Sequence, residues 1–230
     1  MPRSAVTVLN VGGTRVVEHV LGWRSVVVAL GVTLGAAPVM AHPHAWIDLQ
    51  SQVLLDDDGL VRALQFDWVF DDYYTVALAD AGEVVDQLAD DFWQGIAKRN
   101  LDNLADHDYF TAVEFDGQAV ELGTVSRYDG GLRDGRMWMR FELPLAEPKD
   151  PAAGSLSFAV YDPTYYIEII HAVGAVITFD GAGADRCEGE IIQPNPTLEQ
   201  VSLAAALDKD ESAGDGLGEL FAETVQVRCS

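Results

Sequence analysis

The feature that most constrains the fold is a run of alternating apolar residues that turns back on itself. Residues 44–55 and residues 60–70 place most of their apolar side chains at every second position, the period of a half-buried β-strand. Asp58-Gly59 between them is typical of a two-residue hairpin turn. With that turn, Ile47 faces Phe70, apolar against apolar. We therefore predict an antiparallel hairpin with one face in a core.

Short elements of both kinds follow the hairpin. Strands are predicted at residues 112–115, 118–122, 124–128, 136–145, 155–161, 165–172, 175–179, 188–192 and 224–228. A short helix is predicted at 72–80, a long one at 83–106, and another at 198–207 behind a capping Thr197. The predicted fold is α+β, a mostly antiparallel β-sheet assembly with one long and one shorter helix in a single domain.

The first 41 residues resemble a secretion signal. Three arginines precede an apolar run that begins at Val26. The run ends with Val39 and Ala41, small residues at the spacing that signal peptidase accepts. The run is shorter than the roughly 20 apolar residues of a membrane span. We predict cleavage after Ala41, a single periplasmic domain at 42–230, and no lipid anchor. An uncleaved membrane anchor and a misassigned start are the alternatives.

Acidic residues dominate the predicted mature chain. Three of the 14 basic residues and one of the 37 acidic residues precede residue 42, which leaves 11 against 36 and a net charge of −25. Such a field repels nucleic acids and anionic lipids, so we expect neither as a partner. It also concentrates cations. Because a salt-rich habitat selects the same surface, acidity alone does not indicate a metal site.

Cys187 and Cys229 are the only cysteines of the chain. In an oxidising compartment an even pair predicts a disulfide, here between the last strand and the strand that follows Gly183. A metal site with two thiolates is the alternative, but the cysteines lack the CxxC spacing that is typical of such sites.

Two of the five histidines lie one residue apart at the predicted mature start. Cleavage would give His42 a free α-amine beside its own imidazole, with His44 two residues further on. Imidazole is a common ligand of zinc, copper and nickel. In the hairpin register, His44 and Asp71 are diagonal neighbours roughly 7–8 Å apart at the backbone, and Asp48 lies on the same face. The predicted metal site is His42, His44, Asp48 and Asp71. The alternative is that these residues form the solvated face of an amphipathic hairpin.

Three other residues are weaker candidates for completing the site. His107 follows the predicted long helix between two aspartates, where a surface histidine is expected. His171 lies among isoleucines and is predicted to be a satisfied core histidine. Asp162 precedes a proline, as in ordinary turns. Along a continuous strand, Asp162 and His171 would be on the order of 30 Å apart, so at most one of them joins the site.

The type of ligand ranks the metals. Imidazole with carboxylate and without thiolate suits zinc first, and nickel or cobalt second. Copper is third. The α-amine and ring of His42 could hold it, but Pro43 removes a backbone amide that chelation at a third-position histidine would use.

An ordered set of motifs spans residues 42–230. The set comprises His42-Pro43-His44 with Trp46 and Asp48, Trp68-Val69-Phe70-Asp71 with Tyr73 and Tyr74, Tyr161-Asp162-Pro163-Thr164-Tyr165-Tyr166, Cys187, and Leu220-Phe221-Ala222 before Cys229. These motifs resemble the domain of unknown function 1007 family, often labelled the periplasmic component of an uncharacterised ABC-type transport system. The resemblance implies an inner-membrane metal permease or ABC-type transporter as partner. Members are often found with nickel/cobalt-type permeases, and zinc uptake has been proposed for some.

The predicted function is therefore capture or delivery of a divalent metal in the periplasm for such a transporter. A metal-dependent hydrolase or oxidase is a second class. Because the sequence contains neither H-E-x-x-H nor G-x-S-x-G, we expect no enzyme and no catalytic residues. A third class is a β-rich docking module of a transport system that binds no metal.

Overall fold

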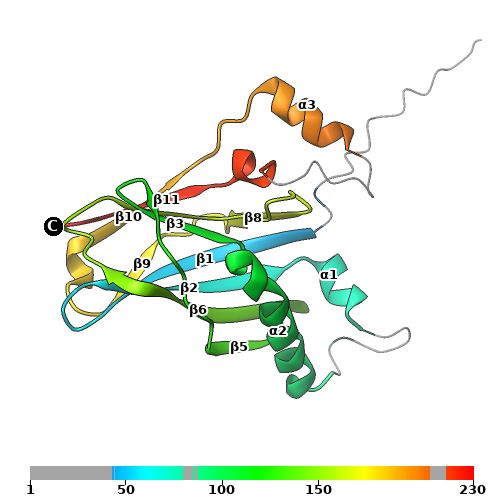
Figure 1. The fold of residues 1–230 in the computed structure, drawn as a ribbon. Coiled ribbons are helices and arrows are strands. Elements are labelled where there is room, and N and C mark those ends of the chain that lie inside the picture. Colours follow the sequence, from blue (N-terminus) through cyan, green and yellow to red (C-terminus); the bar gives the residue numbers. More distant parts are fainter. Residues whose placement is uncertain (1–42, 44, 80–84, 86–87, 208–215) are drawn as a thin grey trace, which may run out of the picture. The chain divides into compact units, whose positions relative to one another are not determined.

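Two β-sheets enclose one hydrophobic core in the computed structural model of the chain (Figure 1). The structure describes residues 43, 45–79, 85, 88–207 and 216–230, and these belong to one compact unit. The predicted α+β class with mostly antiparallel strands is confirmed. In the described part of the chain, no helix is long and apolar enough to cross a membrane.

The first sheet is built on the long hairpin. Its order is β5-β6-β2-β1-β8, and β9 also pairs with β1. The strands are β1 (Ala45–Leu55), β2 (Val61–Phe70), β5 (Arg127–Arg133), β6 (Arg136–Lys149), β8 (Ile167–His171) and β9 (Thr178–Asp180). The predicted hairpin register is confirmed, because Ile47 pairs with Phe70 and Leu49 pairs with Trp68.

The hairpin turn differs from the predicted two-residue turn. The register shifts between Leu54 and Leu55, and Leu55 pairs with Val61. The Asp56 carboxylate explains the wider turn, because its Oδ1 accepts the N–H groups of Asp58 at 3.0 Å and Leu60 at 2.9 Å. A side chain that binds its own backbone in this way replaces ladder hydrogen bonds at a strand end.

The second sheet has the order β10-β11-β7-β3-β4 and is antiparallel throughout. Its strands are β3 (Thr111–Phe115), β4 (Gln118–Ala119), β7 (Leu156–Val160), β10 (Cys187–Ile192) and β11 (Thr224–Cys229). The predicted disulfide is present, and Cys187 and Cys229 are also cross-strand partners. The bond therefore joins β10 to β11 at one end of their ladder.

β8 and β9 both run parallel to β1, which the sequence pattern did not indicate. The chain reaches β8 from β7, which belongs to the other sheet, so no hairpin sets the direction of β8. It then continues past a loop to β9 in the same direction. The two short strands thus occupy successive lengths of one edge of β1, opposite residues 45–49 and 52–54.

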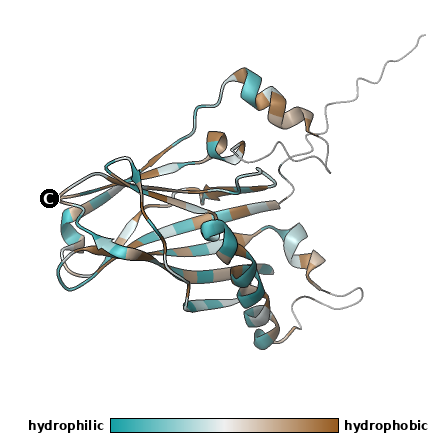
Figure 2. Cartoon of the chain, viewed as in Figure 1, coloured by the Kyte–Doolittle hydropathy of each residue, from teal (hydrophilic) through white to brown (hydrophobic). Residues whose placement is uncertain are grey.

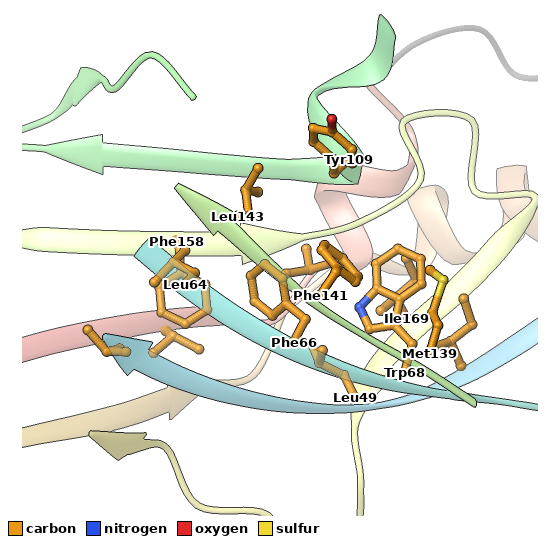
Figure 3. Close-up of a cluster of buried hydrophobic side chains, with 14 of the residues drawn as sticks. Leu49, Leu64, Phe66, Trp68, Tyr109, Met139, Phe141, Leu143, Phe158 and Ile169 are labelled. Carbon is orange, nitrogen blue, oxygen red and sulfur yellow. The ribbon is translucent and has the colours of Figure 1, made fainter. Parts of the chain in front are cut away.

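The core lies between the two sheets and is rich in aromatic rings (Figure 3). Phe66 of β2 has its ring centroid 5.5 Å from that of Phe141 of β6 and 6.0 Å from that of Phe158 of β7, so it joins both sheets. Each fully buried side chain of this size contributes roughly 1.5–3 kcal/mol of transfer free energy. Figure 2 shows polar and apolar residues alternating along the strands of the first sheet, as expected if one face is solvated.

Helices and short 3₁₀ turns complete the chain. They are α1 (Asp72–Ala77), α2 (Asp90–Leu104), η2 (Ala105–Phe110), η3 (Ala184–Arg186), α3 (Leu198–Ala206) and η4 (Gly218–Phe221). The predicted cap of α3 is confirmed, since Thr197 and Gln200 form a capping box. α2 begins at Asp90 rather than at residue 83, and residues 80–84 and 86–87 lie outside the described residues.

β5 begins later and extends further than the strand predicted at 124–128. Both glycines lie inside β5, whereas the predicted strand ended at Tyr128. A Cβ atom at Gly130 would lie 2.5 Å from the Cβ of Ala97 on α2, and one at Gly131 would lie 3.0 Å from the indole nitrogen of Trp138. The glycines therefore allow α2 to pack close to β5 (Figure 1), and they leave room for the indole of Trp138.

Candidate functional site

The predicted metal site lies partly outside the described residues. His42 and His44 fall outside them, whereas Asp48 and Asp71 are described. Asp48 lies in β1 and Asp71 directly follows β2, at the end of the hairpin where β1 begins. Of the four predicted ligands, the structure therefore describes only the two aspartates.

Asp71 uses both carboxylate oxygens on backbone N–H groups. Its Oδ1 accepts the N–H of Tyr74 at 2.8 Å and caps α1, and its Oδ2 accepts the N–H of Trp46 at 2.7 Å. The backbone N–H of Asp71 donates to the carbonyl of Trp46 at 3.0 Å. Asp71 thus joins the start of α1 to the start of β1, a structural role that sequence reasoning missed.

Asp48 is half exposed and ion-paired. Its Oδ2 lies 2.8 Å from Nη1 of Arg136, and its side chain keeps 45% of its surface exposed. Arg136 also donates from Nε to the carbonyl of Phe70 at 2.7 Å and lies 4.0 Å from a carboxylate oxygen of Asp72. A metal ion at Asp48 would have to share the carboxylate with this guanidinium or displace it.

Asp67 belongs to a second charged group, on the same face of the first sheet as Asp48. It is 6% exposed, and its carboxylate binds Arg140 at 2.6 Å and Arg133 at 3.3 Å. Both guanidinium groups lie over the ring of Trp138, at 4.8 Å and 5.9 Å from its centroid. The charges of this group are therefore satisfied by one another and by an aromatic face.

His171 is confirmed as a satisfied core histidine. Its Nδ1 lies 2.7 Å from Oε2 of Glu223, its Nε2 lies 3.0 Å from Oγ of Ser51, and its side chain is 5% exposed. Gln193 donates to the other oxygen of Glu223 at 2.6 Å. Because both ring nitrogens have partners, His171 has no nitrogen left for a metal ion.

The pKa of Glu223 reflects this network. Burial alone would raise it, but hydrogen bonds from the ring and backbone of His171 and from Gln193 favour the charged form and together outweigh burial. The pKa of Glu223 is therefore lowered. The network connects β1 and β8 of the first sheet with the residues that flank β10 and β11 of the second.

The order Ser51, His171, Glu223 is that of a serine hydrolase relay, but its location argues against catalysis. Ser51 is 4% exposed. It shares the inward face of β1 with Leu49 and Val53, since side chains alternate along a strand. Ser51 lies between the two packed sheets, and the hydrogen bonds of the three residues link the first sheet to segments of the second.

Asp162 is confirmed as a turn residue. Its Oδ1 accepts the backbone N–H and the hydroxyl of Thr164, both at 2.8 Å, and its Oδ2 accepts the N–H of Ile167 at 3.0 Å. The side chain is buried, so these donors satisfy it. This carboxylate shapes the loop between β7 and β8.

His107 is exposed in η2, as predicted for a surface histidine. It borders a cavity of about 620 Å³ that is also lined by Glu114, Glu121 and Tyr161. Burial, followed by the charges of Glu219 and Glu114, raises the pKa of Tyr161, so its phenol stays neutral. In the part of the chain that the structure describes, no three His, Cys, Asp or Glu residues are grouped to hold a metal ion.

Comparison with known proteins identifies the chain. A family model described as "Protein of unknown function (DUF1007)" matches residues 27–229. The chain belongs to the DUF1007 family. A relative of the DUF1007 protein, an uncharacterised protein of Haemophilus influenzae, is 26% identical over 215 residues, which is 89% of this chain and 98% of the relative. An uncharacterised 15.5 kDa protein in the trpE 3′ region of Spirochaeta aurantia is 30% identical over 76 residues, 33% of this chain and 54% of that protein. No solved structure matches.

Proposed function

We propose that this DUF1007 protein captures or delivers a divalent metal ion in the periplasm for an inner-membrane permease or ABC-type transporter. His42 and His44 are the leading ligands. Asp48 is the carboxylate that completes the site, and Asp71 either joins it or positions the strand that follows the histidines. Zinc is the first choice, nickel or cobalt the second, and copper the third.

The observation that carries the proposal is the hydrogen bond between Asp71 Oδ2 and the N–H of Trp46, at 2.7 Å. Trp46 lies two residues after His44 in the sequence, so a carboxylate holds the backbone that leads directly from the histidines. A carboxylate beside a ligating imidazole either binds the ion or orients the ring. The half-exposed Asp48 lies on the same strand as Trp46, two residues further on.

Arg136 is the feature that the proposal must accommodate. Its guanidinium binds Asp48 at 2.8 Å, and a fixed positive charge opposes a nearby cation. If Asp48 is a ligand, metal binding releases Arg136. Arg136→Gln is then expected to raise zinc affinity, whereas Asp48→Asn is expected to lower it. A zinc affinity that neither change alters would remove Asp48 from the site.

The test is calorimetric titration of zinc, nickel, cobalt and copper into the chain that begins at His42. A second sample carries His42→Ala and His44→Ala, and a third carries His107→Ala as the matched control. One-to-one binding that disappears only in the double variant supports the proposal. Binding that survives the double variant and weakens in the control would place the metal at His107 instead.

The outer face of the first sheet favours a docking role as the second candidate. The guanidinium groups of Arg133 and Arg140 lie over the ring of Trp138, and tryptophan and arginine are among the residues most enriched at energetic centres of protein interfaces. In this case the protein would dock on a transporter without binding metal. Failure to bind any of the four metals, with transporter binding intact, would favour this candidate.

A further inference from the structure

The cavity of about 620 Å³ that His107 borders lies along β3 of the second sheet. From β3 it is lined by Ala112 and Glu114, which are exposed positions in the alternating pattern of that strand. Ala119 of β4 pairs with Glu114 and also lines the cavity. The short side chains of the two alanines leave room between larger ones. The cavity is open to solvent, because several of its lining residues are exposed.

Two sequence motifs that the metal proposal does not use meet at one wall of this cavity. Tyr161 and Pro163, from the Tyr-Asp-Pro-Thr-Tyr-Tyr motif, line the wall. The carbonyl of Pro163 accepts the N–H of Gly218 at 3.1 Å, and the rings of Tyr165 and Phe221 stack with their centroids 4.4 Å apart. The tyrosine-rich motif before β8 and the Leu-Phe-Ala motif before β11 therefore pack together, and this packing holds the wall in place.

A run of three left-handed residues forms another part of the lining. Asp108, Tyr109 and Phe110 have φ values of 50°, 53° and 55°, a conformation that costs a residue other than glycine roughly 1–2 kcal/mol. Tyr109 anchors the run in the core (Figure 3), and its hydroxyl accepts the N–H of Val125 at 3.1 Å. Asp108 and Phe110, on either side of Tyr109, line the cavity. Backbone strain of this kind is concentrated at ligand sites.

The lining combines negative charge with apolar and aromatic surface. Its carboxylates are those of Asp108, Glu114 and Glu121. Among the described residues, no lysine or arginine lines the cavity. Phe110 and Tyr161 supply aromatic rings, and alanine, valine, leucine and proline side chains make up most of the remainder. The lining therefore favours a ligand that carries a positive charge on a hydrocarbon body.

This lining suits an ammonium group better than a metal ion. In the described part of the chain, no three His, Cys, Asp or Glu side chains are grouped to hold a metal. Carboxylates attract an ammonium group, and an aromatic face within about 6 Å attracts the same cation. A metal ion, by contrast, gains nothing from hydrocarbon walls. The volume also lies within the range of about 300–1,000 Å³ that is usual for small-molecule sites.

We propose that this cavity binds a small organic cation, an ammonium group that carries methyl or methylene groups. The carboxylates of the lining attract the charge, and the rings of Phe110 and Tyr161 contact the carbon atoms around it. Neither Asp48 nor Asp71 lines the cavity, so the site is separate from the proposed metal head, and either proposal can fail without the other.

The test compares choline with 3,3-dimethylbutan-1-ol, which has the same shape but a carbon atom in place of the charged nitrogen. Both compounds are titrated into the full chain at about 0.15 M salt, where long-range attraction to the acidic surface is screened. The backbone N–H signals of Ala112 and Tyr161 are followed by NMR. We expect choline to move these signals in a saturable manner and to bind at least about tenfold more tightly than the alcohol.

Two glutamine variants separate the cavity from the general acidity of the protein. Glu114→Gln removes a carboxylate of the lining, whereas Glu188→Gln removes an exposed carboxylate of β10 and gives the same net charge. We expect only Glu114→Gln to weaken choline binding. Equal weakening by the two changes would show that choline follows the overall charge, and would overturn the proposal. Equal affinity for choline and the alcohol, or no saturable binding of choline, would also overturn it.

Tyr161 tests the aromatic part of the proposal. Tyr161→Phe keeps the ring and should retain most of the affinity for choline. Tyr161→Leu removes the ring and should weaken binding by about 2- to 30-fold, the range that a cation–aromatic contact supplies. Thermal unfolding of each variant checks that it is folded. Equal affinities of folded Tyr161→Phe and Tyr161→Leu would contradict the contact with the ring.

Discussion

Asp71 shows how one side chain can organise the region that we assign to metal binding. It caps α1 through Tyr74 and holds the N–H of Trp46. We predict that Asp71→Ala lowers the free energy of unfolding in urea by about 1–2 kcal/mol, the usual loss for a helix cap. Asp71→Asn should recover part of it, since an amide oxygen still accepts one hydrogen bond. A loss no larger than that of Asp57→Ala, an exposed turn residue, would contradict this role.

Glu223 gives a prediction for the pH dependence of stability. Its pKa in the folded protein is lowered from the ordinary value of 4.5, so its charged form is favoured by folding. The stabilisation is therefore complete above about pH 4.5 and is lost as the pH falls through the lower, folded-state value.

The measurement for Glu223 is urea unfolding of wild type and Glu223→Gln between pH 7 and pH 3. We expect the variant to be less stable at pH 7 and the difference to shrink in acid. Glu190→Gln, at an exposed ion pair with Arg228, is the matched control and should show little difference at any pH. A constant gap for Glu223→Gln across this range would contradict the role assigned to its charge.

At the scale of elements, the disulfide is a covalent link between two strands of the second sheet. It joins the edge strand β10 to β11 across a sequence separation of 42. In the chain-entropy model, closing a loop of that length stabilises the fold by about 4 kcal/mol. We predict a loss of that order for Cys187→Ser with Cys229→Ser, measured by urea unfolding. Equal stability of the double variant and the oxidised wild type would contradict it.

Most elements could be predicted because their signals are local. The alternation along β1 and β2 gave the hairpin register, and Thr197 marked the start of α3. The local pattern carries no information about contacts between distant segments. The strand predicted at 124–128 stopped short of Gly130, because the local pattern does not reveal that α2 packs against this glycine. β8 is parallel to β1 because the chain arrives from the other sheet, a fact that no single strand encodes.

For the candidate site too, local features could be predicted and long-range contacts could not. The hairpin register placed Asp48 and Asp71 at one end of the sheet, but the partners that occupy them were not predicted. Arg136 was predicted within a strand, yet its contact with Asp48 depends on β6 lying beside β2, which sets two distant segments on one face. Similarly, His171 could be predicted as a core residue, but its partners Ser51 and Glu223 come from separate parts of the chain.

At the scale of the whole molecule, net charge governs the response to salt. A net charge of −23 for the full sequence produces self-repulsion that destabilises the compact state. Salt screens this repulsion, with a Debye length of about 10 Å at 0.1 M and about 3 Å at 1 M. We predict that the Tm rises by several degrees when sodium or potassium chloride is increased from about 0.05 M to about 0.5 M. A Tm that falls over this range in both salts would contradict the prediction.

The most direct test of the metal head is X-ray absorption at the zinc edge, on the one-to-one zinc complex of the chain that begins at His42, in high salt. We predict nitrogen and oxygen ligands at about 2.0–2.1 Å, the multiple-scattering signal of two imidazoles, and no sulfur. In the variant with His42→Ala and His44→Ala, the imidazole signal should be absent. A shell of oxygen atoms alone, unchanged by the double variant, would show that zinc binds the acidic surface and would contradict the proposed function.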